Sequence, residues 1–105
     1  MSLAIAILNY NGADLLKRFL PSVLQHSDTA TIYVIDNAST DNSKSLLQAD
    51  FSTVKWIGLD QNYGYAEGYN KGVEQIDESL ICLLNSDVEV TPNWITPMVA
   101  LFEAQ

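Results

Sequence analysis

Two hydrophobic patterns alternate along the chain. Short apolar runs, typical of buried strands, alternate with stretches in which apolar residues recur every three or four positions, as in amphipathic helices. The predicted strands are residues 3–8, 31–35, 54–57 and 80–84. The predicted helices are residues 13–25, 41–48 and 65–76, and a last helix after Thr91-Pro92 that carries Trp94, Ile95, Met98, Val99 and Phe102. This alternation predicts βαβ units, and therefore a three-layer α/β fold: a mostly parallel sheet of four main strands with helices on both faces.

Local signals refine this scheme at a few positions. Pro21 lies inside the first helical pattern, where it should kink the helix or split it into two. Ser39 or Asp41 can cap the second helix. The unbroken apolar run of residues 80–84 predicts a strand that is buried on both faces. Because the chain stops directly after a helix, we expect residues 1–105 to be the first part of a longer domain.

Composition and charge limit the ligands. The 105 residues carry 13 acids against 5 Lys and Arg, a net charge of −8. This balance argues against nucleic acid, which needs a basic face to neutralise phosphates. It also makes binding of a phosphate by Lys or Arg unlikely, so a bound phosphate would need a metal ion or backbone N–H groups. The single cysteine, Cys82, lies in an apolar run and is interpreted as a small buried hydrophobe.

The same residues bear on location. One cysteine offers no disulfide framework, which fits a reducing compartment. The longest apolar run extends only from Leu3 to Leu8, whereas a membrane-spanning helix needs roughly 20 apolar residues. We therefore expect no transmembrane segment in this chain and a cytoplasmic location, with the inner face of the membrane as the alternative.

Polar residues follow three of the predicted strands where each strand ends. They are Asn9-Tyr10-Asn11, Asp36-Asn37-Ala38-Ser39 and Asn85-Ser86-Asp87. Ligands of open α/β sheets bind just outside the carboxyl ends of the strands. Amide and carboxylate oxygens there can accept from a pyrimidine N3–H or from ribose hydroxyls. Any single loop of this kind is better explained by turn chemistry, but three together favour a binding site.

Glycines recur regularly in the third predicted helix. Gly64, Gly68 and Gly72 are spaced four residues apart, and each interior glycine costs about 0.8–1 kcal/mol relative to alanine. Such a bare stripe indicates close approach to another backbone or to a ligand. A parallel stripe of Tyr65, Tyr69, Val73 and Ile76 is interpreted as core. The pattern is not a dinucleotide-binding fingerprint, which requires a strand, a turn and a helix in succession.

Two acids follow the fourth predicted strand. In an extended chain Asp87 and Glu89 point to the same side, so both carboxylates could reach one cation. Hard oxygen ligands suit Mg²⁺ or Mn²⁺, and Mg²⁺ commonly takes one or two carboxylates and completes its shell with water and substrate phosphates. The competing explanation is an acidic pair that favours the dipole of the helix after Pro92. One histidine and one cysteine exclude a Ser-His-Asp or Cys-His catalytic set.

Taken in order, four segments resemble family 2 glycosyltransferases with the GT-A fold. They are Leu8-Asn9-Tyr10-Asn11, the run from Val34 to Asp41, the run from Asn62 to Gly72, and Leu83 to Asp87. The resemblance implies that Leu8, Asn9 and Tyr10 lie near the base, that Asp36 and Asn37 contact base and ribose, and that Asp87 is the metal-linked acid. The full set of candidate nucleotide-binding residues is Leu8, Asn9, Tyr10, Asn11, Asp36, Asn37, Asn62, Gly64, Asn70, Asn85 and Ser86, with Asp87 and Glu89 as candidate metal ligands.

The resemblance also implies an activity. Members of the family transfer a sugar from a nucleoside-diphosphate sugar to a carbohydrate or lipid-linked acceptor with inversion, using a divalent cation, Mg²⁺ or Mn²⁺, in polysaccharide biosynthesis. The Asn-Ser-Asp-Val-Glu form of residues 85–89 looks like the rhamnosyltransferase-like branch. Where this chain has Asp36-Asn37 and Asn85-Ser86, the family often carries additional acids. The family's catalytic base lies in its second half, so here it is expected beyond Gln105.

Three other functions remain open from the residues. A nucleotidyltransferase would carry a Gly-rich loop with Arg or Lys after the first strand, and Asn11-Gly12-Ala13-Asp14 is not such a loop. A receiver-type signalling domain would need acids after the first strand, where this chain has Asn9. A non-catalytic nucleotide-binding or scaffold module is the third. Nucleotide binding distinguishes a scaffold from an enzyme, and phosphorylation by a small phosphodonor would identify a receiver.

Overall fold

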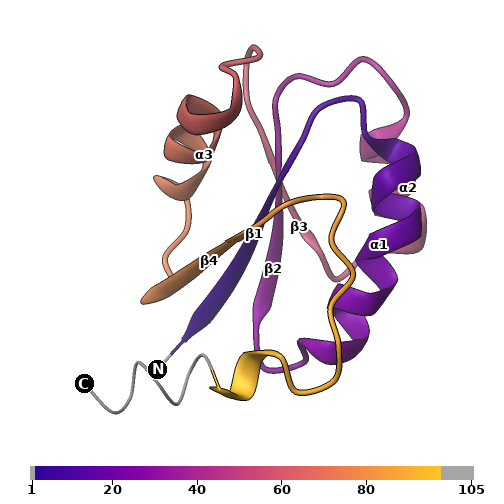
Figure 1. Cartoon of the computed structure of the whole chain (residues 1–105). Helices are drawn as coiled ribbons and strands as arrows, with labels where there is room; N and C mark the ends of the chain where they lie inside the picture. Colours follow the sequence, from indigo (N-terminus) through magenta and orange to yellow (C-terminus); the bar gives the residue numbers. More distant parts are fainter. Residues whose placement is uncertain (1, 98–105) are drawn as a thin grey trace.

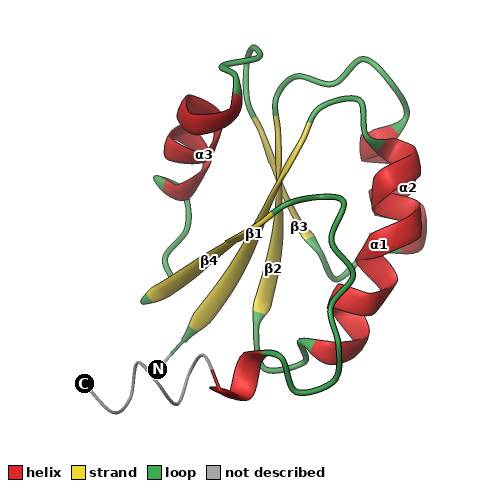
Figure 2. Cartoon of the chain, viewed as in Figure 1, coloured by secondary structure: helices red, strands yellow, loops and turns green. Residues whose placement is uncertain are grey.

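Strands and helices alternate along the chain (Figures 1 and 2). The computed structural model describes residues 2–97. Its elements are β1 (Leu3–Asn9), α1 (Ala13–His26), β2 (Thr31–Asp36), α2 (Ser43–Asp50), β3 (Lys55–Gly58), α3 (Tyr65–Val73) and β4 (Leu80–Leu84). The last predicted helix begins at residue 95 in the described part, and its expected residues Met98, Val99 and Phe102 lie outside the described residues.

The strands form one parallel sheet in the order β3-β2-β1-β4. β1 lies between β2 and β4, so that Ile5 is opposite Ile32 on one side and Cys82 on the other. Parallel strands bring their carboxyl ends to one edge. The loops after β1, β2 and β4 therefore meet at that edge, and the predicted parallel α/β fold is confirmed.

The helices cover both faces of the sheet. Figure 1 shows α1 and α2 on one side and α3 on the other. Ile5 and Val34 pack with Leu16 and Leu20 of α1 in the larger core. The alternate strand residues face α3, and the smaller core on that side is made by Ala4, Ala6, Tyr33, Ile35, Ile57, Tyr69 and Ile76. Two alanines on β1 let α3 lie close to the sheet, and this places the start of α3 beside the carboxyl ends of the strands.

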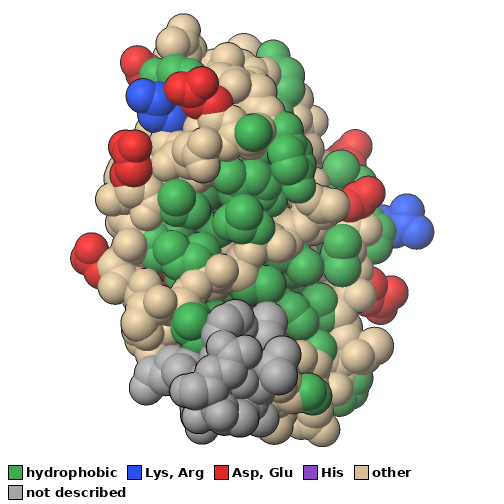
Figure 3. All heavy atoms as spheres, turned by 60° about the vertical axis from the view of Figure 1, so that its left-hand side comes forward, with side chains coloured by type: hydrophobic (Ala, Val, Ile, Leu, Met, Phe, Trp, Pro, Cys, Tyr) green, Lys and Arg blue, Asp and Glu red, His purple; other side chains and the backbone are tan. Residues whose placement is uncertain are grey.

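β4 differs from its prediction, because it is not buried on both faces. Ile81 and Leu83 are 37% and 54% exposed. Within the described residues β4 pairs only with β1, and α3 packs on β1 and β2. The α3 face of the sheet is therefore uncovered over β4, and Figure 3 shows hydrophobic side chains gathered on this side of the molecule, with charged groups at its margins. Cys82 points the other way, and burial raises the pKa of its thiol, as expected for an inert small hydrophobe.

Two further predictions about local structure were wrong. α1 runs unbroken from Ala13 to His26, so the split expected at Pro21 is wrong, and the kink stays a prediction. Pro21 and Lys17 lie on the exposed side of α1, where the Lys17 carbonyl left without a donor is open to water. Thr91-Pro92 does not start a helix. The Trp94 N–H donates to the Thr91 carbonyl over 3.3 Å and Asn93 has φ 62°, which is typical of a type II turn with proline and asparagine at its centre.

Two helix boundaries also moved. α2 begins at Ser43 rather than at residue 41, with Asn42 at the N-cap position. α3 ends at Val73, before the predicted end at Ile76, although Ile76 remains buried in the core on the α3 side. In residues 2–97, no helix combines the length and the apolar character that crossing a bilayer requires.

Candidate functional site

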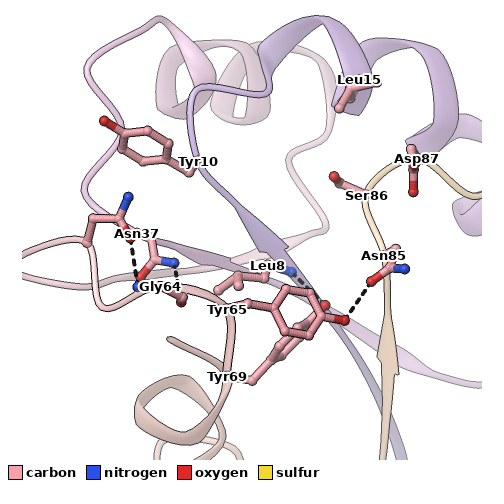
Figure 4. A pocket seen from close by; sticks show the side chains of 11 residues that line it. Leu8, Tyr10, Leu15, Asn37, Gly64, Tyr65, Tyr69, Asn85, Ser86 and Asp87 are labelled. Atoms are coloured by element: carbon pink, nitrogen blue, oxygen red, sulfur yellow. Dashed lines mark hydrogen bonds between the residues drawn. The ribbon is translucent and has the colours of Figure 1, made fainter. Parts of the chain in front are cut away.

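A pocket of about 470 Å³ lies at the carboxyl edge of the sheet (Figure 4). The ends of β1, β2 and β4 contribute to it, together with the start of α1 and the loop that leads into α3. Its lining residues are Leu8, Tyr10, Leu15, Asn37, Asn62, Gly64, Tyr65, Tyr69, Asn85, Ser86 and Asp87. The pocket therefore lies at the edge of the sheet where the polar residues after the strands predict a binding site.

The pocket brings together most of the candidate residues. Leu8, Tyr10, Asn37, Asn62, Gly64, Asn85, Ser86 and Asp87 line it. The other candidates, which are Asn9, Asn11, Asp36, Asn70 and Glu89, do not. Leu15, Tyr65 and Tyr69 line the pocket without having been predicted to do so.

Asn9 and Asp36 lie beneath the pocket and support its loops. Their side chains are 1% and 4% exposed, and Asn9 Nδ2 donates to Asp36 Oδ1 over 2.9 Å. Ser39 donates to the same carboxylate twice, from its hydroxyl over 2.6 Å and from its backbone N–H over 2.9 Å. This carboxylate therefore holds the loop after β2 against the end of β1. Asp36 does not line the pocket, and its expected contact with base and ribose stays a prediction.

Asn11 joins the loops after β1 and β2. It adopts φ 50°, a conformation that asparagine tolerates better than most residues. Its Oδ1 accepts from the N–H groups of Thr40, over 2.7 Å, and Asp41, over 3.2 Å. Its own N–H donates to Ser39 Oγ over 2.8 Å. The polar residues of these two loops thus bind mainly one another, and their neighbours Tyr10 and Asn37 face the pocket.

The Asp41 carboxylate accepts hydrogen bonds at the start of two helices. Its carboxylate accepts the N–H of Ala13, the first residue of α1, over 3.1 Å, and the N–H of Ser43, the first residue of α2, over 3.0 Å. Burial acts to raise the pKa of this carboxyl, but hydrogen bonds from the Ser43 hydroxyl and from these backbone N–H groups outweigh it and lower the pKa below its usual value. Of the two predicted caps, Asp41 is therefore the one that supports α2.

Asn37 holds the loop before α3. Its Nδ2 donates to the Gly64 carbonyl over 3.0 Å, and its Oδ1 accepts the N–H of Tyr63 over 3.2 Å. These two bonds determine which way the amide faces. Asn62 completes the loop by accepting the N–H of Gly64 over 2.8 Å, and Gly64 itself requires glycine because its φ is 80°.

The glycine stripe is explained by the sheet beneath α3. A Cβ on Gly68 would lie 2.7 Å from Asn37 Nδ2, and one on Gly72 would lie 2.3 Å from Ile35 Cδ1. The close approach expected from sequence is therefore real, but it is to side chains of β2 and its following loop. Asn70, on the exposed side of the same helix, lies outside the pocket.

Two tyrosines of α3 reach the far side of the pocket. The Tyr69 hydroxyl accepts from the Leu8 N–H over 3.3 Å and donates to the Leu84 carbonyl over 3.0 Å, so it bridges the ends of β1 and β4. The Tyr65 hydroxyl donates to Asn85 Oδ1 over 2.8 Å (Figure 4). Tyr69 is core, as predicted, but Tyr65 is 64% exposed. The spacing of four residues correctly paired the two rings, yet could not show that the sheet ends before it covers Tyr65.

Asp87 is the acidic group of the pocket. It is exposed and stands in a turn at residues 86–87. Because the chain turns here, Asp87 and Glu89 do not meet the condition of an extended backbone, and Glu89 lies outside the pocket. Within the described residues, no group of three or more His, Cys, Asp or Glu side chains could hold a metal ion alone. The donor set fits a Mg²⁺ or Mn²⁺ ion shared between one carboxylate and a ligand that brings its own oxygens.

Comparison with known sequences assigns the chain to a family. Residues 4–105 match the profile described as glycosyl transferase family 2, and the chain belongs to this family. The succinoglycan biosynthesis protein ExoO of Rhizobium meliloti is 32% identical over 97 residues, which are 90% of this chain and 28% of that protein. An uncharacterized glycosyltransferase of Nostoc sp. is 31% identical over 110 residues, which are 98% of this chain and 33% of that protein.

Solved structures support the same fold. That of S. aureus TarS 1-349 in complex with UDP-GlcNAc has a TM-score of 0.85 at 17% identity, and the match covers 99% of this chain and 32% of the TarS 1-349 chain. The mannosyltransferase PcManGT from Pyrobaculum calidifontis, in complex with GDP-Man and Mn²⁺, has a TM-score of 0.82 at 18% identity and covers 92% of this chain and 31% of that protein. The chain therefore has the fold of the GT-A nucleotide-binding region, and it spans a third or less of the length of the relatives that it matches. The rhamnosyltransferase-like branch stays a prediction.

Proposed function

We propose that this chain is the donor-binding part of a glycosyltransferase that moves a sugar from a nucleoside-diphosphate sugar to an acceptor hydroxyl with inversion. One observation carries the proposal: Tyr10, Asn37 and Asp87, which follow three different strands, line the same pocket. Membership of family 2 supports the reaction class. The acceptor is a carbohydrate or a lipid-linked acceptor, as the family implies.

The two ends of the pocket suit the two ends of a nucleotide. Tyr10 is 51% exposed and offers an aromatic face for a base, and Asn37 lines the pocket with its amide held by Tyr63 and Gly64. At the other end, Asn85, Ser86 and Asp87 offer an amide, a hydroxyl and a carboxylate. When the base binds at the end with Tyr10, the diphosphate lies at the end with Asn85, Ser86 and Asp87.

The second end fits a divalent cation only when a diphosphate is present. The pocket lining contains no Lys, Arg or His, so the charge of two phosphates has no protein cation to balance it. Asp87 would hold Mg²⁺ or Mn²⁺ on the protein side, and Glu89 lies outside the pocket that such an ion would share. The cation would stabilise the charge that develops on the departing nucleoside diphosphate. Both PcManGT and GalNAc-T7, whose fold is similar, are described with Mn²⁺.

The acceptor hydroxyl must lose a proton as it attacks the far side of the sugar. A positioned carboxylate commonly does this. Within the described residues, Asp87 is the one acid that lines the pocket, and it is assigned to the cation. We therefore place the catalytic base outside residues 2–97, and we expect this part of the protein to bind donor without efficient transfer.

Calorimetric titration tests the proposal. UDP, dTDP and GDP are titrated into the chain with and without Mn²⁺, and into the Asp87→Ala variant. We expect one nucleotide to bind in a metal-dependent way, and Asp87→Ala to remove the metal dependence. The matched control is Asp60→Ala, an exposed acid in the loop after β3 that does not line this pocket. No binding by the folded chain across the panel would contradict the proposal.

A further inference from the structure

Tyr65 combines exposure with a specific hydrogen bond. Its ring is 64% exposed, yet its hydroxyl donates to Asn85 Oδ1 over 2.8 Å. Tyr65 is the first residue of α3 and directly follows Gly64, whose carbonyl is held by Asn37. One side chain therefore links the loop at the base end of the pocket to the loop that carries Asp87.

The Tyr65 ring is positioned by its contact with the buried ring of Tyr69. The ring packs edge to face on Tyr69, with centroids 5.2 Å apart and an interplanar angle of 77°. Tyr69 is 3% exposed and is itself held by its bonds to Leu8 and Leu84. Tyr69 and Tyr65, one turn apart on α3, thus bind successive residues at the end of β4. This arrangement brings the Tyr65 hydroxyl to Asn85 with little freedom.

The bond has a consequence for the Asn85 amide. An amide has an acceptor oxygen on one side and an NH₂ donor on the other, and its terminal torsion is broad when nothing restrains it. Because Tyr65 occupies the oxygen, the NH₂ group of Asn85 is directed away from Tyr65, and among residues 2–97 nothing accepts a hydrogen bond from it. An NH₂ donor is valuable in a pocket whose lining has no Lys, Arg or His.

From this geometry we infer that Tyr65 is a positioning residue, which turns the Asn85 amide so that its Nδ2 donates to the diphosphate of the bound nucleotide. The inference rests on the proposed donor-binding function. In this arrangement Asn85 donates a hydrogen bond to the phosphate and is not a metal ligand, although it stands where the family often carries an acid. Tyr65 itself acts only through Asn85.

The test compares ligands that differ only in phosphate content. Affinities for UDP, UMP and uridine, and for GDP, GMP and guanosine, are measured in Mn²⁺ for the wild-type chain and for Tyr65→Phe. We expect Tyr65→Phe to lower the affinity for the diphosphate that the wild type binds by about fivefold to tenfold, as for the loss of one neutral hydrogen bond, the bond that orients the Asn85 amide. The nucleoside should bind equally well to both proteins. An equal loss for nucleoside and diphosphate would overturn the inference, because it would indicate a general structural role.

A double-mutant cycle tests that Tyr65 acts through Asn85. Asn85→Ala alone should lower the affinity for the diphosphate, and adding Tyr65→Phe to it should cause no further loss of affinity. Tyr33→Phe is the matched control, since it also removes a tyrosine hydroxyl bond, of 2.6 Å to Glu78, from a residue that does not line this pocket. Additive losses from Tyr65→Phe and Asn85→Ala would refute the coupling.

The Asn85→Asp variant tests the role of the Asn85 NH₂ group separately. Its result does not depend on whether Tyr65→Phe folds. This change keeps an acceptor for the Tyr65 hydroxyl and removes the NH₂ donor. We expect weaker binding of the diphosphate, whereas a metal-ligand role at this position predicts tighter binding in Mn²⁺. If the wild-type chain binds no diphosphate, the proposed function fails. If it binds, and neither Tyr65→Phe nor Asn85→Asp differs from the wild type, only the role of Tyr65 fails.

Discussion

The side-chain amide of Asn37 donates to the carbonyl of Gly64 over 3.0 Å, and so ties the end of β2 to the loop that begins α3. Asn37 is 2% exposed, and its other amide atom accepts the N–H of Tyr63. Both neighbours are backbone groups with opposite requirements, one an acceptor and one a donor. An asparagine satisfies both at once, whereas a carboxylate satisfies only one.

Asn37→Asp should therefore destabilise the chain near neutral pH, by about 1–3 kcal/mol, because a buried carboxylate would face the Gly64 carbonyl. The pKa of the new carboxyl would be raised in the folded state, so the loss should diminish as the pH falls and the group takes a proton. Urea denaturation at pH 7 and pH 4 measures this.

The control for this change is Asn62→Asp. It adds the same charge to the loop before α3, which Asn37 contacts, but Asn62 is exposed and only accepts the N–H of Gly64, which a carboxylate does equally well. We expect a change within about 0.5 kcal/mol. Equal losses for the two variants would contradict the role given to the Asn37 NH₂ group.

Gly72→Ala should destabilise the fold although alanine is the better helix former. The added Cβ would lie 2.3 Å from Ile35 Cδ1 and 2.6 Å from Ile35 Cγ2, in the core between α3 and the sheet. Overpacking of this kind costs about 1–3 kcal/mol. Asn70→Ala, at an exposed position of the same helix, should leave the stability unchanged or raise it slightly. Thermal unfolding of both variants is the measurement, and a stabilised Gly72→Ala would show that α3 is free to move outward.

Asp41 should make the chain sensitive to acid. Its pKa is lower in the folded state than the ordinary value of 3.8, so the unfolded state binds the proton more readily. The stabilisation is present above that value and is lost as the pH falls through the folded pKa. Asp41→Ala should cost about 1 kcal/mol at pH 7, since the first N–H groups of α1 and α2 lose their acceptor. The difference from wild type should shrink below pH 3.8.

Asp28→Ala is the control for Asp41. Asp28 is an exposed acid in the loop between α1 and β2, away from the start of either helix. Its replacement should leave the slope of stability against pH almost unchanged. A difference between wild type and Asp41→Ala that stays constant from pH 7 to pH 2 would mean that the carboxylate charge is irrelevant to the two helix starts.

The chain should release little nucleoside diphosphate from any sugar donor. Loss of a general base lowers a rate by about 10²–10⁴-fold, and Asp87, the acid that lines the pocket, is committed to the cation. UDP-, GDP- and dTDP-sugars are incubated with the chain and Mn²⁺, and the free nucleotide is measured with and without an acceptor mixture. Efficient release that Asp87→Ala abolishes would show that residues 1–105 contain the whole catalytic apparatus.

The order of elements and the location of the site follow from the sequence by itself. Runs such as residues 3–8 and 31–35 are too apolar to lie anywhere but in a core, and the helical stripe of α1 matches one face of a sheet. Parallel strands must bring their polar ends to one edge, so the position of Asn37 and Asp87 beside a common pocket was predictable. These properties are local, because they depend on the period of a pattern and on the residues next to it.

The exposure and the partner of each side chain depended on the tertiary structure. Whether Leu83 and Tyr65 are covered depends on how far α3 extends across the sheet, and no periodic pattern contains that distance. Asn9 and Asp36 have the composition of ligand-binding residues, but in the fold they bind each other and Ser39. Polar side chains at a strand end satisfy whichever partner is nearest, and only packing decides whether that partner is a ligand or another loop.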